Sequence, residues 1–244
     1  MRIGLIIPAR FESTRFPGKP LALINHMPMI WHVWSRCILA IDPQDVYIAT
    51  ESSKIKETAE SFGAKVIMTS SQCLTGTDRI AEANHLLGYD YVINVQGDEP
   101  LIDPDLVSII KNVACHDQSK VLNLMTRILD VKDFTNPSIP KVVFDTSYHL
   151  LYMSRASIPL TKDSKMIEAY RQVCVYGFSK DHLAFFLDYS KKTKFEKIED
   201  IEILRFVESS IPVKMIEVTS NNIAVDHPRD IDKIESYLHS QKVN

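Results

Sequence analysis

Short apolar runs alternate with segments of helical spacing through the first half of the chain. The strand-like runs cover residues 1–8, 45–50, 65–69, 91–95 and 121–127. Helical spacing covers residues 29–40, 53–62, 78–87 and 104–113. This alternation predicts βαβ units that build a mostly parallel central sheet flanked by helices. The run YVINV at 91–95 is rich in β-branched residues, which favours a central strand.

The pattern changes after residue 141. Three extended runs, KVVFD, HLLYMSR and VCVYGF, follow without full helices between them. They predict a smaller mixed or antiparallel insertion at about residues 130–190, which would bind substrate or form dimer contacts. Helical spacing returns at 181–189 and 198–209, before a strand at 213–218 and a closing helix at 228–241. We therefore predict a single domain over residues 1–244 with an inserted subregion.

Composition narrows the class of protein. The chain has 244 residues, 45% of them hydrophobic and 24% charged, with a net charge of -3, so a general grip on nucleic acid is not expected. Neither a secretory signal nor a membrane-length apolar run is evident, so we expect a cytoplasmic protein without membrane insertion. The four cysteines and eight histidines show no metal-ligand spacing.

The most informative segment is LIIPARFESTRFPGKP, residues 5–20. An apolar strand leads into a loop with three fixed cations, Arg10, Arg15 and Lys19, and with proline and glycine to shape its backbone. Arginine forks and a lysine ammonium at the end of a strand suit a polyphosphate. The alternative is a proline-stiffened turn with solvated charges.

Two acidic residues could hold a metal. Asp98 in QGDEP follows the strand at 91–95, so its carboxylate should emerge at the carboxyl edge of the sheet, where it could bind Mg²⁺ beside phosphates. Asp226 in IAVDHP also follows an apolar run. The alternatives are a turn before Pro100 for Asp98 and a helix cap for Asp226.

Two further segments are candidates for binding. Residues 75–79, TGTDR, combine hydroxyls, a glycine and a helix start, and could bind a nucleobase or an anion, or simply cap a helix. Arg155 lies in an apolar stretch, where it could pair with a substrate carboxylate or with a structural acid.

Taken in order, several blocks resemble the 3-deoxy-manno-octulosonate cytidylyltransferase (CMP-Kdo synthetase) family of lipopolysaccharide assembly. They span roughly residues 5–235 and are IIPARFESTRFPGKPL, PMIWHV, TGTDR, INVQGDEPLI, KVVFD, LYMSRASIP, VYGF and VDHPRDI. The resemblance implies a nucleotide-diphospho-sugar transferase fold, a homodimer, and transfer of CMP from CTP to a 2-keto-3-deoxy sugar acid with release of pyrophosphate.

The resemblance also implies roles for individual residues. Arg10, Lys19 and Asp98 would be catalytic, and Asp98 and Asp226 would hold Mg²⁺. The nucleotide would be bound by Ala9, Arg10, Arg15, Lys19, Thr75, Gly76, Thr77, Asp78, Arg79 and Gln96. The sugar would be bound by Gln96, Arg155, Gln172, Tyr176, Glu199 and Glu202.

Departures from the family pattern concentrate in the sugar half. Gln172 stands where the family usually has His, Ile203 where it has Gln, and Pro140 where a non-proline apolar residue is common. Ordinary Kdo is the first expectation, and a modified acid, such as the 8-amino form or a sialic-type acid, is the alternative. A non-catalytic nucleotide-binding module and a sugar-1-phosphate nucleotidyltransferase are the other readings.

Overall fold

The computed structural model describes residues 1–12, 16–189, 191–220, 224–225 and 227–242. Within them, one large mixed sheet has the strand order β11-β7-β10-β6-β1-β4-β5. Its strands are β1 (Ile3–Pro8), β4 (Val46–Thr50), β5 (Lys65–Met68), β6 (Tyr91–Val95), β7 (Val121–Arg127), β10 (Tyr170–Ser179) and β11 (Val213–Glu217). The pairs β1/β4, β1/β6, β4/β5 and β7/β11 are parallel, as expected for βαβ units.

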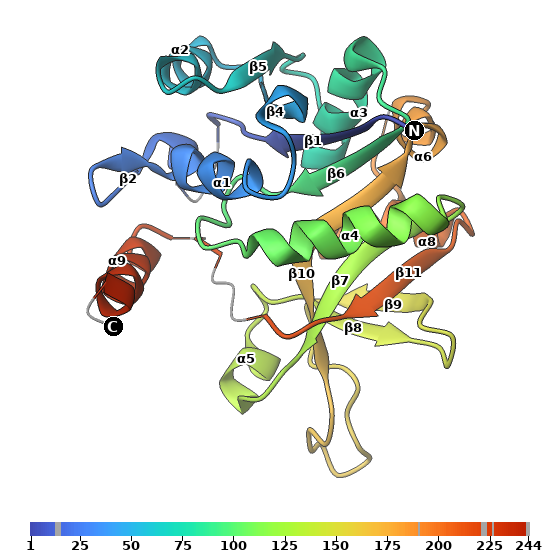
Figure 1. The fold of residues 1–244 in the computed structure, drawn as a ribbon. Helices are drawn as coiled ribbons and strands as arrows, with labels where there is room; N and C mark the ends of the chain where they lie inside the picture. The colour runs from blue at the N-terminus through green and yellow to red at the C-terminus, as the bar shows by residue number, and fades with distance from the viewer. Residues whose placement is uncertain (13–15, 190, 221–223, 226, 243–244) are drawn as a thin grey trace.

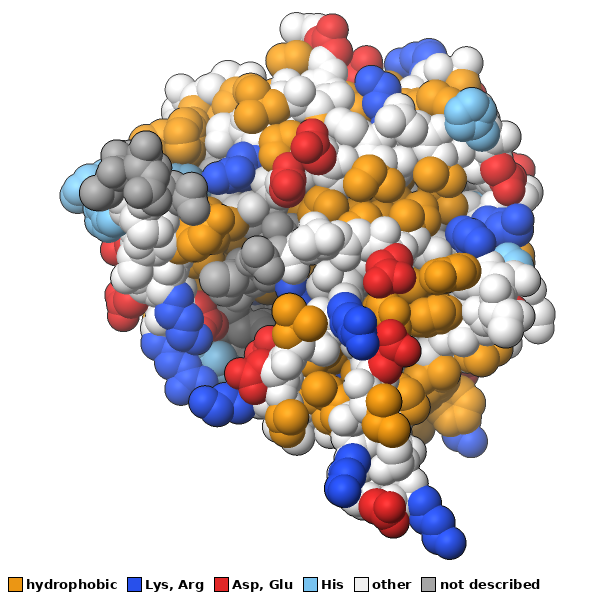
Figure 2. Space-filling view, turned by 60° about the horizontal axis from the view of Figure 1, so that its bottom comes forward, with side chains coloured by type: hydrophobic (Ala, Val, Ile, Leu, Met, Phe, Trp, Pro, Cys, Tyr) orange, Lys and Arg blue, Asp and Glu red, His pale blue; other side chains and the backbone are white. Residues whose placement is uncertain are grey.

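β10 gives the sheet its mixed character. It runs antiparallel between β6 and β7, and it also pairs with β8 (Lys141–Phe144), which in turn pairs with β9 (Leu150–Ser154). Residues 130–190 thus contribute both a hairpin beside the sheet and a strand within it. The charged tip of the β9–β10 loop projects from the molecule (Figure 2), and Lys162, Asp163 and Lys165 are exposed. The division into one domain with an insertion stays a prediction.

Helices cover both faces of the sheet (Figure 1). One apolar cluster joins the sheet to α1 (Met29–Cys37), α2 (Ser53–Ser61) and α4 (Pro104–His116). A second joins the other face to α3 (Gly76–Leu87), α6 (Lys180–Leu187) and α8 (Leu204–Glu208). Alternation along the strands supplies both clusters: in β1, Leu5 and Ile7 point to the first cluster and Ile6 to the second.

Most predicted elements are confirmed, and their ends follow local capping. Thr75 caps α3, so the helix begins two residues before the predicted residue 78, and Gly88 ends it in a left-handed conformation (φ 72°). Asp103 caps α4, with Pro104 at its first position. α9 (Asp230–Lys242) closes the chain.

The helix predicted at 198–209 is only partly confirmed, because it is interrupted at residues 200–203. The chain forms α7 (Lys194–Glu199), then a left-handed residue at Asp200 (φ 52°), and then α8. A capping box between Thr193 and Glu196 starts α7 early, and Asp200 ends it. Sequence reasoning also missed α5 (Val131–Thr135) and the short hairpin of β2 (Leu23–Ile24) and β3 (Met27–Pro28). Among the described residues, none of the helices has both the length and the apolar character needed to cross a bilayer.

Candidate active site

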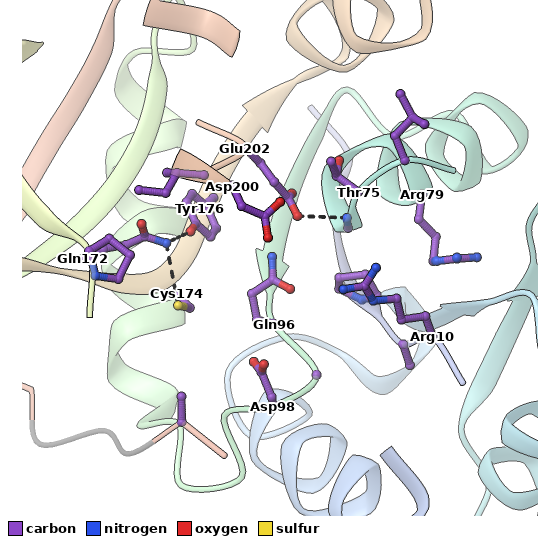
Figure 3. A pocket seen from close by; sticks show the side chains of 18 of the residues that line it. Arg10, Thr75, Arg79, Gln96, Asp98, Gln172, Cys174, Tyr176, Asp200 and Glu202 are labelled. Atoms are coloured by element: carbon purple, nitrogen blue, oxygen red, sulfur yellow. Dashed lines mark hydrogen bonds between the residues drawn. The ribbon is translucent and has the colours of Figure 1, made fainter. Parts of the chain in front are cut away.

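A cleft of about 370 Å³ opens at the carboxyl ends of β1 and β6. Its volume lies within the range of small-molecule sites, and this edge of an α/β sheet is where ligands usually bind. Two groups of residues face each other across it, with Gln96 between them (Figure 3). We call the lining residues within 8–20, 73–79 and 96–98 the basic wall. Those within 138–155, 172–176 and 192–202 form the β10 wall.

An ion pair between Lys19 and Asp98 lies in the basic wall. Lys19 Nζ is 2.7 Å from Asp98 Oδ2 and also donates to the Val225 carbonyl at 2.8 Å. The Val225 amide donates to the Asp98 carbonyl at 2.9 Å, so three segments distant in sequence meet here. Arg15 and Asp226, both expected at the site, lie outside the described residues.

The loop after β1 presents Arg10 to the cleft. Ala9 also lines the cleft, but its amide donates to the Ala49 carbonyl at 2.8 Å and is therefore used within the sheet. Gly18 adopts a left-handed conformation (φ 69°), and its amide bonds the Phe11 carbonyl, which closes the loop and delivers Lys19.

The amino end of α3 faces the cleft at Thr75 and Gly76. The Glu202 carboxylate accepts hydrogen bonds from the amides of Gly76 (3.0 Å) and Thr77 (2.8 Å), a favourable place for a negative charge. Burial raises the pKa of Glu202, and the bonds from Thr77 and Gly76 oppose that shift. An added Cβ at Gly76 would lie 3.4 Å from the Gln96 and Glu202 side chains, so the approach is close.

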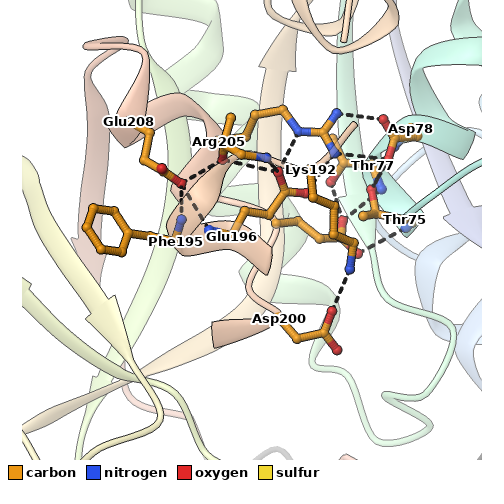
Figure 4. Close-up of polar contacts among 12 residues, drawn as sticks. Thr75, Thr77, Asp78, Lys192, Phe195, Glu196, Asp200, Arg205 and Glu208 are labelled. Atoms are coloured by element: carbon orange, nitrogen blue, oxygen red, sulfur yellow. Dashed lines mark hydrogen bonds and ion pairs between the residues drawn. The ribbon is translucent and has the colours of Figure 1, made fainter. Parts of the chain in front are cut away.

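A buried ion network lies behind the α3 start (Figure 4). Arg205 Nη1 is 2.7 Å from Asp78 Oδ1, and its Nη2 is 2.7 Å from Glu196 Oε1. Burial alone would lower the pKa of Arg205, but the hydrogen bonds with Glu196 and Asp78 outweigh it and raise the pKa. Among the described residues, Thr77 and Asp78 are not part of the cleft lining; Thr77 bonds Glu202 and Asp78 bonds Arg205 of α8, which holds the TGTDR segment in place.

Arg79 lines the cleft but is already paired. Its Nη2 is 2.8 Å from Glu51 Oε2, and its Nη1 donates to Thr69 Oγ1. Glu51 also accepts the Phe11 amide at 2.8 Å. Arg79 and Glu51 therefore tie the α3 start to the loop after β1.

A bulge in β10 brings the two walls together. The register against β7 shifts between Val173 and Tyr176, and Asn123 Nδ2 donates to the Val173 and Val175 carbonyls at 3.0 Å each. The Cys174 carbonyl accepts the Gln96 amide at 3.3 Å. Bulged β10 is thereby held over the end of β6.

Arg155 on the β10 wall is held by backbone carbonyls. It donates to the Glu199 carbonyl at 2.5 Å and to those of Pro137 and Asp200 at 3.0 Å. The described ion pairs give its guanidinium no carboxylate partner, and two of its five N–H groups remain for a ligand. The Glu199 carboxylate accepts the Arg155 amide (2.9 Å) and Ser154 Oγ (2.6 Å); among the described residues, Glu199 is not part of the cleft lining.

Lys141 holds the same wall from inside. Its side chain is buried and donates to the carbonyls of Asn136 (2.9 Å), Ile139 (2.7 Å) and Arg155 (2.8 Å). Burial, and then the charge of Arg155, lower the pKa of Lys141. At the rim, Lys192 Nζ lies 2.6 Å from Asp200 Oδ1, where sequence reasoning had placed no site residue.

Three side chains of β10 line the cleft: Gln172, Cys174 and Tyr176. Gln172 Nε2 donates to the Tyr176 hydroxyl, while its Oε1 is buried without a partner among the described residues. Burial raises the pKa of Tyr176, and negative charge on nearby groups, Glu202 among them, adds to the shift. Ile203, the other departure from the family pattern, is buried in the apolar core.

Comparison with known proteins identifies the family. A family model described as Cytidylyltransferase matches residues 5–217. The chain belongs to the cytidylyltransferase family. Two relatives named 8-amino-3,8-dideoxy-manno-octulosonate cytidylyltransferase, from Shewanella putrefaciens and Shewanella pealeana, are 40% and 39% identical, each with 98% of this chain and 99% of the relative covered.

A solved structure agrees with the cytidylyltransferase assignment. It is described as CMP:2-keto-3-deoxy-manno-octonic acid synthetase complexed with CTP, and superposes with a TM-score of 0.90 at 31% identity, covering 99% of this chain and 100% of the other. The predicted fold class and the predicted family are therefore confirmed.

The described residues of this cytidylyltransferase offer few side-chain ligands for a metal ion. No group of three or more His, Cys, Asp or Glu side chains could surround a metal ion within the described ranges. Mg²⁺, however, usually needs only one or two carboxylates, together with waters and substrate phosphates. Asp98 in an open cleft of the cytidylyltransferase fits that requirement.

Proposed function

We propose that the protein transfers CMP from CTP to a 2-keto-3-deoxy sugar acid of the manno-octulosonate type. The observation that carries this proposal is a single cavity with positive side chains on both walls. Arg10 and Lys19 lie beside Asp98 on the basic wall, and Arg155 lies on the β10 wall. A triphosphate needs the first group and a sugar carboxylate the second. The names of the relatives and of the solved structure support the same pair of substrates.

The nucleotide fits the basic wall. Arg10 and Lys19, and Arg15 by resemblance, would neutralise the triphosphate. Thr75, Gly76 and Gln96 would contact the rest of the nucleotide, and Thr77, Asp78 and Arg79 would hold that segment in place. This orientation would put the α-phosphate near Gln96, which lies between the two groups of side chains in Figure 3.

In the proposed reaction, the anomeric hydroxyl oxygen of the sugar forms a bond to the α-phosphorus, and the bond from that phosphorus to the pyrophosphate oxygen breaks. The hydroxyl proton passes to water, and pyrophosphate leaves. Lys19 and Arg10 stabilise charge on the departing pyrophosphate, while Arg155 and Gln96 orient the acceptor. Asp98 and Asp226 would hold Mg²⁺. When bound, Mg²⁺ supplies positive charge that favours ionisation of the hydroxyl and in-line displacement.

Among possible acceptors, we propose the 8-amino acid as the preferred one and ordinary Kdo as the alternative. Relatives named for the 8-amino acid reach 40% identity, whereas the solved structure named for the hydroxyl acid stands at 31%.

We also propose, from the family resemblance, a homodimer that works in the cytoplasm. Light scattering at assay concentration tests the dimer, and a monomer with full activity would contradict it.

The experiment that tests the function is pyrophosphate release from CTP and Mg²⁺ with a panel of acceptors. Release with 8-amino Kdo or Kdo, and formation of the matching CMP-sugar, are expected. CTP binding without release across all sugar acids would instead support a non-catalytic module. Turnover of a sugar 1-phosphate would support a different nucleotidyltransferase.

A further inference from the structure

Gln172 occupies a defined place in the cleft. β10 is antiparallel to β6, and its residues before Cys174 continue past the end of β6 into the β10 wall. The Gln172 amide donates to the Pro140 carbonyl at 3.1 Å, and Gln172 is opposite Met125 in β7. The backbone beneath this side chain is therefore held from both sides.

Only the nitrogen of the Gln172 side-chain amide has a hydrogen-bond partner among the described residues. Nε2 donates to the Tyr176 hydroxyl and lies 3.7 Å from Cys174 Sγ. Oε1 is a buried acceptor without a partner in the described part of the chain. Buried polar atoms are nearly always paired, so an unpaired acceptor in the wall of a cleft points to a ligand that brings a donor.

The surrounding charge favours a cationic donor. After burial and the Cys174 thiol, the carboxylates of Glu202 and Asp98 raise the pKa of Tyr176, the hydrogen-bond partner of Gln172. Both carboxylates also line the cleft, so a substrate group beside Tyr176 lies close to negative charge. An aliphatic amine is protonated at neutral pH, so nearby carboxylates attract it, whereas a neutral hydroxyl group has no such attraction.

We propose that Gln172 is the residue that selects an amino-bearing sugar acid, with Oε1 accepting a hydrogen bond from the ammonium of the substrate. The proposal rests on the proposed function, since it concerns the acceptor of the same reaction. A histidine here, as in the family pattern, carries at most one acceptor nitrogen, and when protonated it presents only donors and a repelling charge. Glutamine keeps a neutral acceptor at every pH.

The test compares kcat/KM for 8-amino Kdo with kcat/KM for Kdo in the wild type, Gln172→His and Gln172→Glu. The wild type should prefer the amino acid by about tenfold or more, since a hydrogen bond to a charged group is at stake. Gln172→His should lose most of that ratio, and Gln172→Glu, which keeps an acceptor and adds negative charge, should retain or increase it. The KM for CTP should not change, and Gln118→His on an exposed turn is the matched control.

The outcomes separate this inference from the proposed function. Pyrophosphate release with neither acid would overturn the function itself. A wild type that turns over both acids but prefers Kdo, or a ratio that stays the same in Gln172→His, would overturn the role of Gln172 and leave the function standing. If the histidine variant does not fold, a ratio that collapses in Gln172→Glu overturns the proposal.

Discussion

The basic wall and the β10 wall of the cleft are built in different ways. The basic wall comes from three short contiguous motifs, each placed at the end of a strand or the start of a helix. The β10 wall is assembled from distant segments; Arg155 in this wall and Lys141 behind it are held by backbone carbonyls. A wall made of motifs keeps its chemistry wherever the motifs are kept, whereas a wall made of long-range contacts can change its substrate through single side chains.

The largest effect is expected at Asp98 in the basic wall. Asp98→Asn removes the negative charge that pairs with Lys19 and that would bind Mg²⁺, so kcat should fall by about 10³-fold or more. Pyrophosphate release measures this. The thermal unfolding midpoint should stay near that of the wild type, and exposed Asp163→Asn is the matched control. Near-normal formation of CMP-sugar would contradict the metal assignment.

The next effect concerns the buried ion network behind the start of α3. Arg205→Met leaves the carboxylates of Asp78 and Glu196 buried without their partner, and should lower the free energy of unfolding by about 3–5 kcal/mol. Denaturant unfolding measures it. The triple variant with Asp78→Asn and Glu196→Gln should recover part of the loss, because no buried charge is then unpaired. Equal instability of the single and triple variants would show that packing, not charge, dominates.

The fold was predictable where apolar pattern and local capping decide the structure. Strands at 91–95 and 121–127 have the predicted bounds because short, mostly apolar and buried runs leave little choice. The helix expected at 198–209 is interrupted because Arg155 binds the carbonyls of Glu199 and Asp200, 44 and 45 residues away, where the chain turns left-handed. Helical spacing in the sequence cannot predict such a long-range contact.

The same distinction between local pattern and long-range contact separates the site residues that could be predicted from those that could not. Arg10, Lys19 and Asp98 could be placed at the cleft because each lies in a motif that follows a strand, and the family resemblance added Gln96; their roles stay predictions. Arg205 was missed, since its partner Asp78 is 127 residues away and a lone arginine in a helical segment predicts only a solvated face. Asn123 and Glu51 were missed for the same reason. For Asn123 there was a usable indication, because it is a polar residue inside an otherwise apolar strand.

Glu99, which is buried next to the cleft residue Asp98, offers a test by pH. Burial, and then the charge of Asp98, raise the pKa of Glu99 to about 7 from its ordinary 4.5. The folded protein therefore retains a proton that the unfolded chain releases, so the free energy of unfolding falls as pH rises from 4.5 to 7. Glu99→Gln lacks this loss and should be more stable than the wild type at pH 8, by about 3 kcal/mol, and not at pH 4.

The measurement is denaturant unfolding across that pH range with a chelator present, and exposed Glu57→Gln is its matched control. A stability gain that does not change with pH would show that the Glu99 carboxylate is not protonated in the folded protein at neutral pH.

The smallest effect separates the two walls by substrate. Arg155→Lys keeps the charge but cannot bond three carbonyls and still present a planar pair of N–H groups, so the KM for the sugar acid should rise about tenfold while the KM for CTP stays the same. Steady-state kinetics with each substrate varied measures both values, and exposed Arg127→Lys is the matched control. Equal rises in both KM values would show that Arg155 supports the whole cleft rather than the sugar end, and the division into two independent walls would then be wrong.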